Sequence, residues 1–406
     1  MKSGPLLAAL RYRNFRNLWI GSFASYAGQW VQQATIAWLA YDMTGSSSLL
    51  GAIMGMRAIP MFLCAPLAGV AADRYNRRNL LLASQFLSGA TALVFGMVLA
   101  MGVAQVWHLF VFVLISGAAA VLDRPVRTTL IFDLVPRETV MQAVALNMMS
   151  FTITRVCGPA VAGYLIAWFG AAGNLFVQAA CYILAASTVL FIVFPRHEPK
   201  TSGRSAFAEL AEGLRYAFND RTTRPLLLAG IMTFHLLVPV FGGLMPIYAK
   251  DIFHSGPEVL GLLLTSVGVG GVAGSWIAGK CMGIPRQGVI QGCSVVVMSV
   301  AFLGLAVAPS VALGCTALII AGCAEIVLFT SNQATMQMSV PAEMRGRMAS
   351  LQQLYPGFTA FGIFTEGIIV EFIGIQALTV LIAIAAAICA ALLLTPRGGL
   401  AAVRVG

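Results

Sequence analysis

Apolar runs of about 20 residues recur along the entire chain, and no other feature limits the possible folds as strongly. An α-helix of about 20 residues crosses the roughly 30 Å hydrocarbon core of a bilayer. A transmembrane β-barrel would instead show short segments of alternating polarity. The sequence therefore predicts an all-α integral membrane protein with about twelve transmembrane helices. We place these spans near residues 17–41, 47–71, 80–101, 105–127, 142–168, 173–194, 225–248, 258–280, 289–308, 311–332, 349–371 and 375–395.

The overall composition agrees with a membrane protein. Hydrophobic residues make up 59% of the 406 residues and charged residues only 10%, whereas a soluble domain has roughly 25% charged residues. The basic first residues lead directly into a full-length span, so we expect no cleavable signal peptide. All eight cysteines lie in apolar spans, without a CxxC pair or a cluster with histidine. This pattern favours a packing role over a disulfide framework or a metal site.

The positive charges predict the orientation of the chain in the membrane. If the number of spans is even, both termini lie on one side, and 22 of the 25 Lys and Arg residues fall on that side. The opposite side has only Lys250, while Arg57 and Arg155 lie inside spans. Cytoplasmic loops are enriched in Lys and Arg, so we expect a multi-pass protein of the cell inner (cytoplasmic) membrane with both termini in the cytoplasm. The net charge of +10 then reflects topology and contact with anionic lipids, not nucleic-acid binding.

Two bundles of six helices are predicted, at residues 1–195 and 225–406, with a cytoplasmic central loop at 196–224. The apolar residues of this loop that recur at helical spacing are Phe207, Leu210, Leu214 and Phe218. They predict an amphipathic helix on the inner membrane surface, with a flexible linker as the alternative.

Weak internal repeats support the division into two halves. Val135-Pro136-x-Glu138 recurs 205 positions later as Val340-Pro341-x-Glu343, and Gly163 and Gly170 recur 204 positions later as Gly367 and Gly374. Tyr41-Asp42 ends the first span and Tyr248-x-x-Asp251 ends the seventh. The common order and near-constant offset indicate duplication of a six-helix unit, as in many transporters.

The loop after the second span contains Gly69-Val-Ala-Ala-Asp73-Arg74-Tyr-Asn-Arg77-Arg78. This sequence resembles the G-x-x-x-D-R-x-x-R-R loop of the major facilitator superfamily of transporters. The resemblance implies a cytoplasmic gate in which Asp73 faces the positive N-terminal end of span eleven. The tendency of inner loops to be basic explains Arg77 and Arg78, but neither Asp73 nor Gly69.

Three further residues belong to the predicted gate. Arg345 and Arg347 precede span eleven and add positive charge where Asp73 is expected. Asp123 lies at the cytoplasmic end of span four, where we expect it to pair with Arg77 or Arg78; proton carriage is the alternative.

Three other stretches resemble one branch of the superfamily, namely residues 11–19, 38–45 and 340–347. This branch contains the enterobactin exporter and the macrolide efflux proteins, within the drug:proton antiporter subgroup, and the resemblance covers nearly the whole chain. Span five contains Gly158-Pro159-Ala-Val-Ala-Gly163, which is similar to the Gly-Pro motif associated with export in that superfamily. Thr154 and Ala162 replace two of its usual glycines, and a purely structural kink at Pro159 is an equal alternative.

Ionisable groups inside spans cost about 2.5–3.5 kcal/mol each on insertion scales and are functional candidates by default. Arg57 and Arg155 lie near the middle of spans two and five and suit an anionic substrate; internal pairing is the alternative. Gln29 and Gln33 in span one are further candidates for contact with the substrate.

The second half supplies two intramembrane acids, Glu325 in span ten and Glu366 in span eleven. Burial favours the protonated form of a carboxyl group, and a change in its surroundings releases the proton, as proton antiport requires. Structural pairing, for Glu366 with Arg57 or Arg155, is equally compatible with the sequence. His235 in span seven is a third titratable candidate, although a lone histidine is more often a hydrogen-bonded packing residue.

Together these features predict a secondary active transporter. We expect a proton-coupled exporter of a small amphiphilic or anionic compound, of the siderophore or drug type, that works by alternating access as a monomer. A proton-coupled importer of a small solute and a lipid flippase are the alternatives on the same fold. The sequence shows no nucleophile–base pair, metal cluster or phosphate-binding loop, so we expect neither an enzyme nor a cofactor or metal.

Overall fold

The computed structural model describes residues 6–64, 75–194, 206–395 and 398–403. These residues form two compact units: Met1–Leu39 with Ile59–Gly203, and Ala40–Ala58 with Arg204–Gly406. The segment Ala40–Ala58 therefore packs with the second unit, although the residues before and after it belong to the first. The predicted bundle boundaries at 195 and 225 remain a prediction.

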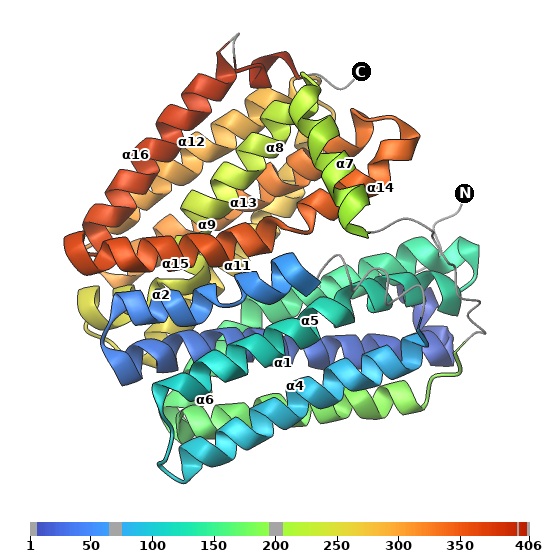
Figure 1. Ribbon diagram of the computed structural model, residues 1–406, viewed down its shortest axis with the longest axis vertical. Helices are drawn as coiled ribbons and strands as arrows, with labels where there is room; N and C mark the ends of the chain where they lie inside the picture. The colour runs from blue at the N-terminus through green and yellow to red at the C-terminus, as the bar shows by residue number, and fades with distance from the viewer. Residues whose placement is uncertain (1–5, 65–74, 195–205, 396–397, 404–406) are drawn as a thin grey trace. The chain divides into compact units, whose positions relative to one another are not determined.

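The first unit consists of long helices. They are α1 (Arg13–Thr44, whose last residues belong to the second unit), α4 (Arg77–Ala100), α5 (Val106–Leu134) and α6 (Val140–Leu190), with short 3₁₀ turns at Leu6–Arg11 and Arg137–Thr139. Helix α4 packs against α5 and α6 (Figure 1). The backbone of α6 leaves helical geometry at Gly170, where φ is 69°. Glycine adopts this left-handed conformation without a Cβ penalty, and the break separates the predicted fifth and sixth spans.

The second unit contains more and shorter helices. They are α2 (Ser47–Gly55), α7 (Ala206–Asn219), α8 (Thr223–Met232), α9 (Val238–Gly243), α10 (Met245–Ile247), α11 (Pro257–Cys281), α12 (Gln287–Ala306), α13 (Val311–Met338), α14 (Ala342–Gln352), α15 (Tyr355–Ile373) and α16 (Ile375–Leu394), with a 3₁₀ turn at Leu400–Ala402. Helix α13 packs against α11 and α12, α12 against α16, and α15 against α2 (Figure 1).

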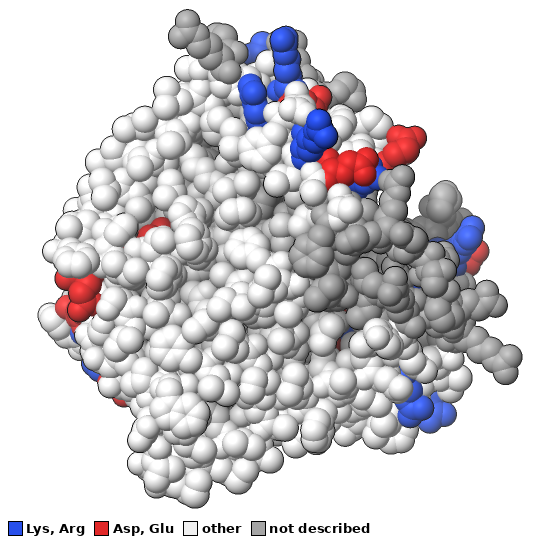
Figure 2. Space-filling model, in the orientation of Figure 1, with Lys and Arg blue, Asp and Glu red and all other residues white. Residues whose placement is uncertain are grey.

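The membrane spans agree with the sequence prediction. Among the described residues, ten helices are long and apolar enough to cross a membrane. One of these ten helices, Arg137–Leu190, contains the break at Gly170 and corresponds to two predicted spans. The predicted span 17–41 lies in α1, which is not one of the ten helices. The face in Figure 2 shows a broad uncharged surface, with charged side chains chiefly near its edges, as expected where lipid contacts protein. The protein is therefore an all-α membrane protein.

The seventh predicted span is interrupted. Two π-helical turns, Thr233–Leu237 and Tyr248–Ile252, flank the short helices α9 and α10. Pro239 and Gly242 lie within this stretch, and both residue types weaken regular helix. π-Helical turns and broken membrane helices are common at functional sites of transporters.

The central loop contains the predicted helix, α7. Ala217 of α7 is fully buried in an apolar cluster with residues of α8, α13 and α14, whereas Leu214 and Phe218 are exposed. Exposed apolar side chains on one face of a helix at the edge of a membrane bundle are typical of contact with the lipid interface.

Glycines of α11 pack against α13. A Cβ added to Gly270 would lie 2.0 Å from the carbonyl oxygen of Ile319, and one added to Gly274 would lie 2.4 Å from that of Cys323. Real Cβ atoms do not approach backbone this closely, so the two helices contact each other at these glycines.

This contact predicts opposite outcomes for two Gly→Ala variants in the second unit. Gly270→Ala forces α11 and α13 apart, and overpacking of this kind costs roughly 1–3 kcal/mol. The matched control is Gly304→Ala in α12, where the added Cβ meets no atom closer than 4.0 Å. In detergent, the midpoint of thermal unfolding should fall for Gly270→Ala and stay constant or rise for Gly304→Ala. Equal midpoints for the two variants would contradict the close contact.

Candidate functional site

Part of the predicted cytoplasmic gate lies outside the described residues. Gly69, Asp73 and Arg74 belong to this part, so their place at the end of span eleven remains a prediction. Arg77 and Arg78 are the first two residues of α4. Asn76 caps this helix, because its side-chain oxygen accepts a hydrogen bond from the backbone N–H of Arg78 at 2.9 Å.

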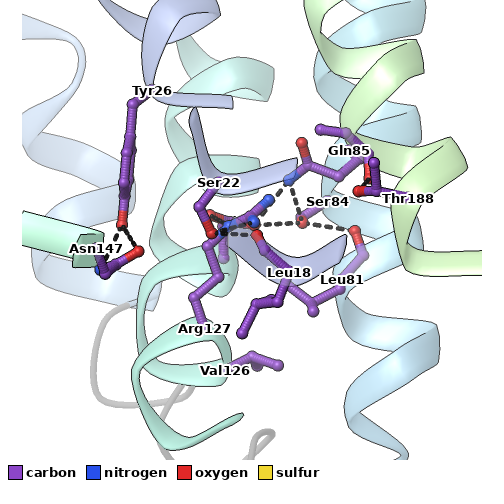
Figure 3. Close-up of polar contacts among 12 residues, drawn as sticks. Leu18, Ser22, Tyr26, Leu81, Ser84, Gln85, Val126, Arg127, Asn147 and Thr188 are labelled. Atoms are coloured by element: carbon purple, nitrogen blue, oxygen red, sulfur yellow. Dashed lines mark hydrogen bonds and ion pairs between the residues drawn. The ribbon is translucent and has the colours of Figure 1, made fainter. Parts of the chain in front are cut away.

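Asp123 and Arg127 form a buried ion pair on α5, and Figure 3 labels Arg127 with its neighbours Ser22, Ser84 and Gln85. The Nε of Arg127 lies 2.5 Å from the Oδ2 of Asp123, one helical turn away, and Arg127 Nη1 donates to Ser22 Oγ of α1 at 3.1 Å. From α4, Gln85 Nε2 donates to Asp123 Oδ1 at 2.7 Å and Ser84 Oγ donates to it at 3.3 Å. Arg127 is 2% exposed and Asp123 9%. A charged pair at this depth is tolerated because neighbouring helices supply further hydrogen-bond partners to both of its members.

The predicted pairing of Asp123 with Arg77 or Arg78 is therefore wrong. Arg77 forms an ion pair with Asp133, near the end of α5, a partner that was not predicted. Helices α4 and α5 are antiparallel neighbours, and each residue advances a helix by 1.5 Å. On α4, Gln85 lies eight positions after Arg77, and on α5, Asp123 lies ten positions before Asp133. The similar offsets place Gln85 opposite Asp123 and Arg77 opposite Asp133. Matching residues at equal depth in the two helices would have identified the correct pairs.

The second unit contains a neutral counterpart of this pair. Asn332 of α13 follows Arg127 by 205 positions, and Gln291 of α12 follows Gln85 by 206. Asn332 Nδ2 donates to Gln291 Oε1 at 3.1 Å and to the carbonyl oxygen of Leu226 in α8 at 2.8 Å. The offsets match those of the sequence repeats, and duplication of one helical unit stays a prediction. At the position 205 after Asp123 the second unit has Leu328, so it has no ion pair at the equivalent place.

The predicted gate residues before span eleven lie on α14. Arg345 is exposed, whereas Arg347 Nη1 forms an ion pair with Glu212 Oε1 of α7 at 2.9 Å. A Cβ on Gly213 would lie 3.1 Å from the Cβ of Arg347, so α7 lies close against α14 at this point. Glu212 was not predicted as this partner, because the central loop has no fixed spacing to span eleven in the sequence.

The candidate substrate-binding residues are half-buried. Arg57 lies in a turn at Met56–Arg57 that interrupts the second span before helix resumes at Ala58. Arg155 lies on α6, and Gln29 and Gln33 lie on α1, all with intermediate exposure. Mid-span cations on half-buried positions are compatible with contact to an anionic substrate.

The third glutamine of α1, Gln32, has a different role. It is buried, donates to Ser116 Oγ at 2.8 Å, and accepts a hydrogen bond from Gln178 Nε2 at 2.9 Å. These contacts join α1, α5 and α6 inside the first unit. Gln32 therefore stabilises the packing of three helices.

The Gly-Pro motif packs against α1. Gly158, Pro159 and Gly163 are buried within α6, and a Cβ on Gly158 would lie 2.7 Å from the Cβ of Trp30. The glycine thus permits close approach of Trp30 to α6. Any role of this motif in the direction of transport remains a prediction.

The titratable candidates of the second unit have contrasting surroundings. His235 lies in the first π-helical turn, with Nδ1 3.4 Å from the carbonyl oxygen of Phe358 and its ring stacked on Phe361 at 5.5 Å. Glu325 is buried in α13. Glu366 of α15 is only 2% exposed, and neither of its carboxyl oxygens has a hydrogen-bond partner among the described residues.

Similar proteins of known type cover most of this chain. The staphyloferrin A transporter of Staphylococcus aureus (strain NCTC 8325 / PS 47) is 22% identical and aligns over 87% of this chain and 89% of its own length. The multidrug efflux pump Tap of Mycolicibacterium fortuitum is 24% identical over 93% and 91%. The macrolide efflux protein A of Streptococcus pyogenes is 21% identical over 65% and 66%.

Solved transporter structures share the fold. A bacterial homolog of the human lysosomal transporter Spinster superposes with a TM-score of 0.76 at 13% identity, covering 97% of this chain and 99% of its own. The nucleoside transporter NupG gives a TM-score of 0.75 at 15% identity, over 93% and 97%.

A family model described as transmembrane secretion effector matches residues 4–403, which is nearly the full length. The chain therefore belongs to the transmembrane secretion effector family, transporters of the siderophore and drug efflux branch of the major facilitator superfamily.

Proposed function

We propose that the protein is a proton-coupled exporter of a small amphiphilic or anionic compound and works by alternating access. The relatives named for staphyloferrin A, for multiple drugs and for macrolides support this substrate range. The proposal rests chiefly on the carboxyl group of Glu366 in α15. This group is buried, and neither of its oxygens has a hydrogen-bond partner among the described residues.

Glu366 has the surroundings that a proton carrier needs. An ionised carboxylate without a partner is very costly in a medium of low dielectric constant, so burial favours its neutral form. Access of water or of a cation lowers this cost and permits release of the proton. Alternating exposure of α15 to the two sides of the membrane would thus load and unload Glu366 once per cycle.

The substrate side of the proposal rests on Arg57 and Arg155. Both are half-buried within predicted spans, where an arginine is retained only at a cost. Guanidinium groups bind carboxylate or phenolate oxygens through paired N–H donors. Gln29 and Gln33 of α1 are further candidates for neutral donors and acceptors to the substrate.

The proposed orientation places both termini and the central loop in the cytoplasm, at the inner membrane. It is supported by the concentration of 22 of the 25 Lys and Arg residues on one side. In this orientation the Asp73 loop and α14 lie at the inner face, where Asp73 would hold the end of span eleven.

Replacing Glu366 with glutamine should separate proton coupling from substrate movement. Glutamine has nearly the shape of the neutral acid but cannot release a proton, so folding should be retained. Uphill transport driven by a proton gradient should fall by about tenfold or more, which corresponds to a rise of about 1.4 kcal/mol or more in the activation free energy. Exchange of labelled for unlabelled substrate in proteoliposomes should continue.

The control for this variant is Glu138→Gln, which makes the same change at an exposed carboxylate. It should transport as the natural protein does. Unchanged gradient-driven transport by Glu366→Gln would reject Glu366 as the proton carrier. Transport only into the cytoplasmic compartment, measured in vesicles of known orientation, would favour an importer instead.

The cytoplasmic gate gives a separate prediction. Asp73→Asn removes the charge that would face the positive end of span eleven, so transport should be lost while the yield of monodisperse protein changes little. Transport would be measured in everted vesicles and the yield by size-exclusion chromatography. Natural flux in this variant would rule out the gate.

A further inference from the structure

Helix α7 has one face buried in the second unit. Ala217 lies in the apolar cluster with residues of α8, α13 and α14, and a Cβ on Gly213 would lie 3.1 Å from the Cβ of Arg347. The ion pair of Glu212 with Arg347 holds α7 against α14 at the same point, with 2.9 Å between Nη1 and Oε1. These contacts fix the position of α7 along one side, so its other side keeps a constant orientation.

The other side of α7 is apolar at its centre. Leu214 and Phe218 lie four positions apart and share one face of the helix. Their exposed fractions are 40% and 43%. Two large apolar side chains next to each other on an exposed helix favour contact with hydrocarbon over contact with water.

Three arginines accompany this apolar face. Arg215 follows Leu214 on α7, and Arg221 and Arg224 follow the end of the helix. All three are exposed, and none of them forms an ion pair within the part of the chain that the structure describes. In Figure 2, Lys and Arg side chains gather where Figure 1 shows the upper part of α7. The exposed side of α7 therefore combines apolar groups with positive charge.

Two of these arginines lie at the boundary of a membrane span. Helix α8 opens the candidate span Thr223–Gly243, and Arg221 and Arg224 lie on either side of its first residue. The adjacent acid, Asp220, caps α8: its Oδ2 accepts hydrogen bonds from the backbone N–H groups of Thr222 at 3.0 Å and Thr223 at 2.7 Å. Basic residues directly before a membrane helix lie at the level of the lipid headgroups.

We infer that Leu214, Arg215, Phe218, Arg221 and Arg224 form a binding surface for anionic phospholipids of the inner leaflet. Guanidinium groups bind phosphate oxygens through paired N–H donors, and the apolar pair packs against the upper part of the acyl chains. A soluble anion would occupy the arginines but leave Leu214 and Phe218 in water, so a lipid fits the whole surface better. The choice of leaflet rests on the proposed orientation, whereas lipid binding does not depend on transport.

Spin-labelled lipids test this inference. Phe218→Cys is introduced into a parent in which the eight natural cysteines are replaced by serine or alanine, and the thiol receives a nitrobenzoxadiazole fluorophore. The protein is reconstituted into vesicles of phosphatidylcholine and phosphatidylglycerol in equal amounts, with the acyl-chain spin label on one lipid or on the other. The quenching should report an enrichment of phosphatidylglycerol at position 218 of about fivefold or more at low salt, and less at high salt.

Charge-matched variants separate this surface from the net charge of the protein. Replacing Arg215, Arg221 and Arg224 together with glutamine should remove the enrichment. The control removes the same charge at three exposed arginines elsewhere and should keep the enrichment: Arg11→Gln, Arg137→Gln and Arg286→Gln. Equal quenching by the two lipids, quenching by neither lipid, or equal enrichment in the two triple variants would each overturn the inference.

Two further measurements complete the test. Added glycerol 1-phosphate should leave the quenching unchanged; displacement of the lipid by this soluble anion would overturn the lipid assignment. With Phe218 intact and the protein in detergent, phosphatidylglycerol should raise the midpoint of thermal unfolding more than phosphatidylcholine does. The α7 triple variant should lose this difference, and its absence from the natural protein would contradict the surface. None of these measurements requires transport, so failure of the proposed function would leave their results unchanged.

Discussion

The cost of an unsatisfied polar or charged group in hydrocarbon is the constraint on which the rest of the structure depends. In the first unit, Arg127 and Asp123 meet this constraint through donors and acceptors from α1 and α4. In the second unit, Asn332 and Gln291 solve the same problem without charge. Glu366 departs from this pattern, because both of its carboxyl oxygens are buried without a hydrogen-bond partner among the described residues. A departure maintained against such a cost is a candidate for function, and we propose proton carriage as that function.

Much of the fold was predictable from the sequence, because a bilayer permits few architectures. Span positions followed from hydropathy. Side-chain partners were less predictable. Asp123 was expected to pair with Arg77 or Arg78, but the register of α4 against α5 gives Arg77 to Asp133. Such pairs depend on tertiary register, which hydropathy does not encode.

The central claim is that outward movement of substrate is driven by protons moving the other way. Its most direct measurement uses purified protein in liposomes that contain a pH-sensitive dye and carry an imposed proton gradient, with a labelled macrolide or staphyloferrin A as substrate. The account predicts that substrate accumulates on the acidic side, that the dye reports matching proton flow, and that reversing the gradient reverses both. Substrate movement that ignores the gradient, or accumulation on the alkaline side, would contradict it.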